Sequence, residues 1–378
     1  MIKLGSIKPT VFSDDGGYCL RYNLYSSGLA TLINMKNNEE NKIHLPKAIA
    51  ACAISKNGDE IANIDDRGNI YLTDTKSLKT EKITNIFSEF SLAEEAMPRA
   101  MFFLDDLNKI VTFIYFEQYK PREEFQCVVV TDLQNKKSEI ALKIENSCFL
   151  SVEKKSNKFT LFLIMRKPKQ QYGFIKFEIP AKITVLNFES AKQYGVDRWY
   201  LKNLSPSIFD FSDRYFYGIK MPGVFGIHYK NCCFFDYKNK RVISNEGAVW
   251  KGKTFEFINW LPKNNLFLFK LKNIDNYYVG DIESKSVIAG IAFNGFDIDI
   301  RKYFPNTEAI TINLANKKDF SFTNKSQPIN SMYVANDKFI VFGNGKSEFA
   351  LEMDALMEIL EAQSEKVQSR KGSRPLKI

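Results

Sequence analysis

The chain has 378 residues, a formal net charge of +9 and 44% hydrophobic residues, among them 32 Phe and 17 Tyr. This composition excludes a disordered chain, and the charges that interrupt every apolar run exclude a membrane-spanning helix. Aromatic residues favour β-strands, so we expect an all-β protein. The N-terminal segment lacks the long apolar core of a secretion signal, which predicts a cytoplasmic protein with no membrane partner.

The positive charge suggests an acidic partner, either nucleic acid or an acidic protein surface. A bias toward Lys and Asn would give the same charge without any function. The six cysteines are scattered and form no Cys-x-x-Cys pair, so we expect buried free thiols and no metal site. The adjacent Cys232 and Cys233 would point to opposite faces of a strand, which disfavours a shared metal or a disulfide between them.

The clearest local pattern lies in residues 47–79, where short apolar runs alternate with turns. The turn at residues 56–59 contains Asn-Gly, and the turn at residues 65–68 contains Asp-Asp-Arg-Gly. Such turns between short apolar runs indicate antiparallel hairpins. We therefore predict a small antiparallel sheet in this region.

The same unit recurs along the chain, as a turn rich in Asp, Asn, Gly or Lys followed by an apolar run. The first apolar residues after the turns are Tyr18, Ile61, Ile110, Phe159, Tyr215, Leu266, Ala309 and Phe339. Their spacings are 43, 49, 49, 56, 51, 43 and 30 residues. Periods of about 40 to 50 residues with four short strands are typical of propeller blades.

A second marker follows the first in phase, as an acidic or amide residue that ends the next apolar run. These markers are Asn34, Asp74, Asp132, Glu178, Asp236, Asp281 and Asn324. They resemble the end of the third strand of a WD-repeat blade, although the Trp of the Trp-Asp pair is missing. The Gly-His dipeptide of true WD repeats is also missing, because the only histidines are His44 and His228.

The chain thus resembles the WD-repeat-like β-propeller class over most of residues 1–345, which implies an architecture and no mechanism. We predict a single propeller over residues 1–346 with seven blades, because the last spacing of 30 residues is short for a separate blade; eight blades stay open. The strand at about residues 2–7 should complete the last blade and join the two ends of the chain.

An amphipathic helix is predicted for residues 347–369, because Phe349, Met353, Leu356, Leu360 and Val367 recur at helical spacing. Residues 370–378 form a basic tail that we predict to be disordered. The helix either packs on the propeller itself or binds a partner together with the tail. In the second case the candidate contacts are Met353, Leu356, Leu360, Arg370, Lys371 and Arg374.

No catalytic motif is present: the sequence has no P-loop, no HExxH and no dinucleotide-binding glycine pattern, and two histidines disfavour a His-based triad. The acid pairs at residues 14–15, 65–66 and 105–106 are explained by turn formation. Carboxylates from different blades could still meet in a central channel. We expect no enzyme, no cofactor and no metal.

The recognition surface should lie on the face that carries the connections between second and third strands and between blades. Long or tryptophan-containing examples of these connections define the candidate partner-binding residues, which are Tyr119, Lys120, Arg122, Arg166, Lys167, Lys169, Trp199, Phe225, His228, Tyr229 and Trp250. In the alternative interpretation the aromatic residues fill gaps between blades and the charges solvate loops.

These observations predict a non-catalytic propeller scaffold that binds another protein, as a subunit of a larger hetero-complex. The alternative is nucleic-acid binding, in which bases stack on the aromatic rings and Lys and Arg neutralise phosphates. Two further hypotheses are an inhibitor of an acidic toxin or enzyme, and an enzyme with carboxylates at the channel mouth.

Overall fold

The structure is a computed structural model, and it describes residues 2–5, 10–24, 28–46, 48–92, 96–119, 122–155, 158–165, 171–179, 184–190, 199–200, 215–220, 232–236, 239, 241–243, 247–251, 253, 255–261, 265–271, 277–293, 304, 308–312, 331–335, 338–343 and 348–361. The chain divides into two compact units, one of residues 8–193 and one of residues 1–7 with 194–378. Among the described residues, no helix is both long and apolar enough to cross a membrane.

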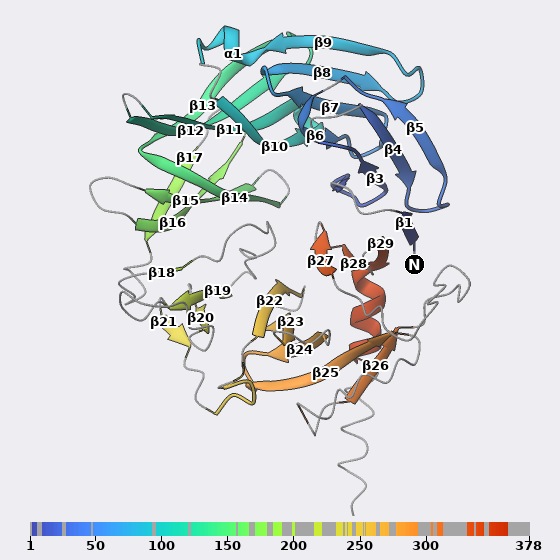
Figure 1. Ribbon diagram of the computed structural model, residues 1–378, viewed down its shortest axis with the longest axis vertical. Helices are drawn as coiled ribbons and strands as arrows, with labels where there is room; N and C mark the ends of the chain where they lie inside the picture. Colours follow the sequence, from blue (N-terminus) through green and yellow to red (C-terminus); the bar gives the residue numbers. More distant parts are fainter. Residues whose placement is uncertain are drawn as a thin grey trace, which may run out of the picture. The chain divides into compact units, whose positions relative to one another are not determined.

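The unit of residues 8–193 contains four-stranded antiparallel sheets, numbered I to IV in chain order (Figure 1). Sheet I consists of β2 (Thr10–Phe12), β3 (Tyr18–Arg21), β4 (Leu29–Asn34) and β5 (Glu40–His44). Sheet II consists of β6 (Ile49–Ile54), β7 (Glu60–Asp65), β8 (Asn69–Asp74) and β9 (Thr80–Asn85), followed by helix α1 (Ile86–Glu89). Sheet III consists of β10 (Ala96–Leu104), β11 (Lys109–Tyr119), β12 (Arg122–Asp132) and β13 (Lys137–Glu145), with a 3-10 turn at Asp105–Leu107. Sheet IV consists of β14 (Ser147–Lys155), β15 (Lys158–Met165), β16 (Gln171–Glu178) and β17 (Thr184–Ser190).

The other unit contains sheets V to VII. Sheet V consists of β18 (Trp199–Tyr200), β19 (Tyr215–Lys220), β20 (Cys232–Asp236) and β21 (Arg241–Ile243). Sheet VI consists of β22 (Phe255–Trp260), β23 (Leu266–Leu271), β24 (Tyr277–Asp281), β25 (Ser286–Phe293) and β26 (Glu308–Ile312). Sheet VII consists of β27 (Ser331–Ala335), β28 (Phe339–Gly343), β29 (Glu348–Glu352) and β1 (Ile2–Gly5).

The sheets agree with the predicted seven-blade repeat, and β1 completes the last of them. β1 pairs antiparallel with β29, with Ile2 opposite Ala350 and Lys3 opposite Phe349. The predicted N-terminal closing strand is therefore confirmed. Within the first unit, apolar side chains of sheets I and II, II and III, and III and IV pack against one another in buried clusters.

The predicted turn that precedes Ala309 does not start a blade. Ala309 lies in β26, which is the fifth strand of sheet VI and pairs parallel with β25. The other seven predicted starting residues are the first or second residues of the second strand of their sheets. The short spacing of 30 residues thus reflects an extra strand. The described residues form no eighth sheet, which counts against the alternative of eight blades.

The second marker ends the third strand in each sheet where the structure describes it: Asn34, Asp74, Asp132, Glu178, Asp236 and Asp281. Asn324 lies outside the described residues. The carboxylate caps the following turn: Asp74 Oδ1 accepts the Ser77 N–H at 2.6 Å, and Asp132 Oδ1 accepts the Asn135 N–H at 2.8 Å. These backbone hydrogen bonds lower the pKa of both aspartates. The marker residue is therefore a turn former.

Four residues after the marker, the same turn uses a left-handed backbone conformation. The residues there are Asn38, Leu78, Lys136 and Lys285, with φ of 60°, 58°, 52° and 55°. Asn tolerates this conformation better than other non-glycine residues, because its side chain can form local hydrogen bonds. Leucine has no polar group and pays the backbone strain without such compensation. The leucine is also 58% exposed, so it contributes little burial.

Replacing Leu78 with asparagine should raise the free energy of unfolding by about 0.5–1 kcal/mol, since it relieves backbone strain at little cost in burial. Urea denaturation of the purified chain measures the change. Lys79→Asn, in the same turn but with an ordinary φ, is the matched control and should give no gain. A destabilised Leu78→Asn variant would show that the leucine packs more strongly than its exposure indicates.

The predicted C-terminal helix begins later than expected. Residues 348–352 form β29, and the helix occupies residues 353–361. Phe349 was wrongly included in the helix, because β29 is held by hydrogen-bonded pairing with both β28 and β1. Strand pairing on two sides outweighs the helical spacing of the apolar residues.

The helix packs on its own unit. Met353, Leu356 and Leu360 are 1%, 0% and 6% exposed and belong to an apolar cluster formed with sheets VI and VII. The prediction that these three side chains bind a partner is therefore wrong, and the alternative of a helix docked on the propeller holds. Their burial in this cluster leaves them no surface for a second protein.

Candidate functional site

The predicted partner-binding residues have different outcomes. Outside the described residues are Lys120, Arg166, Lys167, Lys169, Phe225, His228, Tyr229, Arg370, Lys371 and Arg374. Tyr119 and Arg122 form the last pair of β11 and β12, and Trp199 starts β18. These predictions stay untested as contacts.

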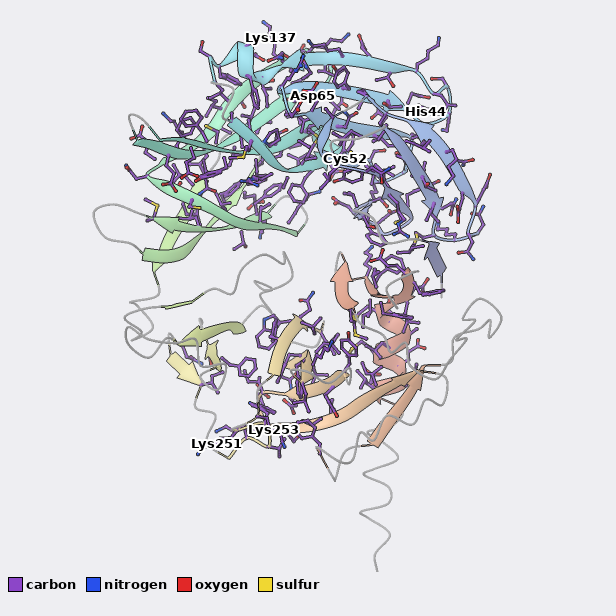
Figure 2. The ribbon with its side chains drawn as sticks, in the orientation of Figure 1. His44, Cys52, Asp65, Lys137, Lys251 and Lys253 are labelled. Atoms are coloured by element: carbon purple, nitrogen blue, oxygen red, sulfur yellow. The ribbon has the colours of Figure 1, made fainter. Side chains whose placement is uncertain are left out.

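The prediction that Trp250 binds a partner is wrong. Trp250 is 2% exposed, and its ring lies 6.1 Å from that of Phe234 and 5.3 Å from that of Phe267. An apolar cluster between sheets V and VI thus holds it, as the alternative of aromatic gap-filling predicts. Its neighbours Lys251 and Lys253 lie at the margin of this unit (Figure 2), and Lys253 Nζ lies 5.3 Å from the centre of the Phe304 ring.

The connection from Glu117 to Phe125 is a projecting hairpin. β10 pairs with β11 only up to Phe116, and β13 pairs with β12 only from Phe125 onward. Between these limits, residues 117–119 and 122–124 continue the strand register with one another, and the Glu124 carbonyl oxygen also accepts the Asn146 N–H at 2.7 Å. An isolated two-stranded ribbon adds little stability of its own. The region predicted as a long connection is therefore mostly strand, since β11 runs to Tyr119 and β12 starts at Arg122.

A tyrosine and two glutamates lie at the base of this hairpin. Glu117 and Glu124 are directly opposite each other in the strand register, where like charges repel. The Tyr115 hydroxyl donates to Glu117 Oε2 at 2.8 Å and lies 3.4 Å from Glu124 Oε1. Burial, followed by the bond to Glu117, raises the pKa of Tyr115, so the phenol stays protonated and keeps donating.

A β-bulge places a cation beside this group. The β10–β11 register shifts between Pro98 and Ala100, which leaves Arg99 in the bulge. The Arg99 guanidinium lies 5.5 Å from the centre of the Tyr115 ring, a cation–π contact, and its Nη2 lies 3.6 Å from the Met97 sulfur. Arg99 is exposed, and Met97 is 38% exposed. We call Met97, Arg99, Tyr115 and Glu117 the hairpin base.

The paired acids at residues 14–15, 65–66 and 105–106 have structural partners. Asp65, within sheet II (Figure 2), accepts the Asn69 N–H at 2.8 Å, and Asp105 accepts the Lys56 N–H at 2.7 Å. Asp14 forms an ion pair with Lys154, which also donates to the carbonyl oxygen of Phe103. Among the described residues, no group of three or more His, Cys, Asp or Glu is arranged to hold a metal ion.

The sequence did not single out Met97, Arg99 or Tyr115. Met97 and Arg99 belong to an apolar strand, and only the bulge turns Arg99 toward the Tyr115 ring. The interruption of that strand by Pro98-Arg99 was the available signal, because proline inside a strand marks an edge or a bulge.

No protein-family model and no curated protein match the sequence. Among solved structures, the Dos1 propeller aligns with a TM-score of 0.50 at 12% identity, over 92% of this chain and 78% of that chain. The β-propeller domain of the trilobed protease from Pyrococcus furiosus aligns with a TM-score of 0.45 at 13% identity, over 93% and 97% of the two chains. The acylaminoacyl peptidase from Pyrococcus horikoshii aligns with a TM-score of 0.44 at 13% identity, over 75% of this chain and 45% of that chain.

Identities this low show the fold alone. The repeat of four-stranded sheets and the likeness to the Dos1 propeller both indicate a β-propeller. They do not show that the repeats are WD repeats. The chain is a β-propeller whose described residues form seven blades.

Proposed function

We propose that this β-propeller is a non-catalytic subunit of a larger complex and binds another protein through the hairpin that projects from sheet III. The observation that carries this proposal is the hairpin itself, whose residues 117–119 and 122–124 pair with one another beyond the last described pairs with β10 and β13. Binding residues are commonly placed on such connections, above a scaffold that folds without them.

The composition of the hairpin base supports a protein partner. Met and Arg are enriched in the centres of protein interfaces, and the exposed Met97 and Arg99 lie in contact there, with the buried Tyr115 ring beneath Arg99. Glu117 and Glu124 disfavour a polyanion at this position, since two carboxylates would repel its phosphates.

Shortening the hairpin tests the proposal. Residues 118–123 are replaced by Asn-Gly, a two-residue turn that joins the opposed Glu117 and Glu124. We expect the thermal transition to be kept, because the described strand pairs of the removed residues are with one another. Proteins co-purified with the wild-type chain from its native host should fall to background, as identified by mass spectrometry.

Leu78→Asn serves as the folded control and should keep the co-purified proteins. A shortened variant that folds normally and still recovers the same proteins would contradict the proposal.

Nucleic-acid binding is the second candidate, favoured by the net charge of +9. It predicts affinity for single-stranded RNA or DNA that falls steeply with salt. Absence of salt-dependent binding at low ionic strength removes it.

A further inference from the structure

The bulge at Arg99 belongs to a repeated feature of the blades. The same register shift between the first and second strands occurs in sheets II, III, IV and VI. The residues in the bulge are Ala50, Arg99, Leu150 and Ile258. Three of these blades therefore hold an apolar side chain at the position where sheet III holds an exposed arginine. The bulge forms with alanine, leucine or isoleucine in the other three sheets, so it does not require an arginine.

Arg99 is held in place but carries an unmatched charge. Its guanidinium carbon lies over the Tyr115 ring, 5.5 Å from the ring centre, and its Nη2 contacts the Met97 sulfur at 3.6 Å. It makes no ion pair with any residue that the structure describes. The cation–π contact restrains the side chain, and guanidinium N–H donors not used by Met97 can pair with an anion.

The chemistry of the surroundings selects the kind of anion. The Tyr115 hydroxyl contacts the carboxylates of Glu117 and Glu124, so a string of phosphates passing this point would meet two negative charges. A single carboxylate carries less charge than a string of phosphates and meets less of this repulsion. Met97, 38% exposed beside Arg99, offers an apolar contact next to the cation.

We infer that Arg99 binds an aspartate or glutamate side chain of a partner protein, with an apolar partner residue packed on Met97. This inference rests on the proposed function, and it names the chemistry of the partner segment. The planar guanidinium can pair with a carboxylate through two parallel N–H···O bonds, which lysine cannot do.

A random linear peptide library displayed on phage is the probe. Selections are run in parallel on the full wild-type chain and on Arg99→Glu. The wild type should enrich peptides that contain Asp or Glu next to Leu, Met or Phe. The Arg99→Glu chain should lose these peptides and favour Lys or Arg at the same position, because the charge of the site is reversed.

The best acidic peptide is then synthesised and its Kd measured by fluorescence anisotropy. Arg99→Glu should weaken binding about tenfold to a hundredfold, the usual range for one hydrogen-bonded charge pair. Arg99→Lys should recover only part of this loss. Lys36→Glu makes the same charge change at an exposed turn of sheet I and should leave the Kd unchanged.

Three outcomes would overturn the inference. The first is a wild-type selection that enriches no acidic peptides. The second is a Kd of an enriched peptide that does not change with Arg99→Glu. The third is Arg99-dependent binding of single-stranded RNA, which would show a phosphate ligand. The proposed function has its own test, since loss of the co-purified proteins on hairpin shortening can hold while Arg99→Glu changes nothing.

Discussion

Replacing Leu356 with alanine should lower the free energy of unfolding by about 2–5 kcal/mol, the usual cost of emptying a fully packed leucine site. Leu356 is 0% exposed and packs in the cluster that joins the C-terminal helix to sheets VI and VII. Members of this cluster such as Phe342 of β28 and Val279 of β24 lie in strands paired on both sides, which limits collapse of the cavity. Guanidinium denaturation of the purified chain gives the change in midpoint.

The exposed side of the same helix supplies the control. Glu358 is exposed, and Glu358→Ala should change stability by less than about 0.5 kcal/mol. If both substitutions are neutral, the helix does not belong to the core of its unit. A partner-binding role for this apolar face would then have to be considered again.

A methyl group added at Gly280 should destabilise the chain by about 1–3 kcal/mol, as overpacking of a core does. A Cβ at this position would lie 2.4 Å from Cζ of Phe267 and 2.6 Å from its Cε1. Phe267 is 0% exposed and is surrounded by Trp250, Phe257 and Phe269, so its ring has no room to move. Thermal unfolding of Gly280→Ala measures the loss.

A double-mutant cycle with Phe267→Leu separates the clash from any other effect of the alanine. The leucine is shorter than the ring, so Gly280→Ala should cost less in that background than in the wild type. Gly17→Ala is the second control, because its Cβ would meet only the carboxylate of Asp15 at 3.2 Å. Equal costs in both backgrounds would contradict the steric explanation.

The repeat was predictable from sequence because it has two local markers. One is the turn before the second strand, and the other is the acidic or amide residue at the end of the third strand. The Asp74 carboxylate shows why the second marker is reliable: it accepts two backbone N–H groups of its own turn, so the requirement is local. Local requirements of this kind can be read from a few neighbouring residues. The prediction failed where a distant segment decided the outcome, as at β29, which the N-terminal strand holds.

The candidate site was predictable only in part. The length of the connection from Glu117 to Phe125 pointed to the hairpin, whereas Arg99 depends on a shift in strand register that no residue type specifies. Trp250 was misplaced for a related reason, since the same indole can bind a partner or fill a gap between sheets. Only packing against Phe234 and Phe267 decides between these roles.

The strand that completes sheet VII has a consequence for synthesis on the ribosome. Its residues 2–5 are made before the other strands, but their partner at residues 348–352 leaves the ribosome only after the other blades have been made. Contacts between such distant segments form slowly, and domains otherwise fold as they emerge. We therefore expect this blade to assemble last. A chain released before residue 348 would expose the unpaired edge of β28, a surface prone to aggregation.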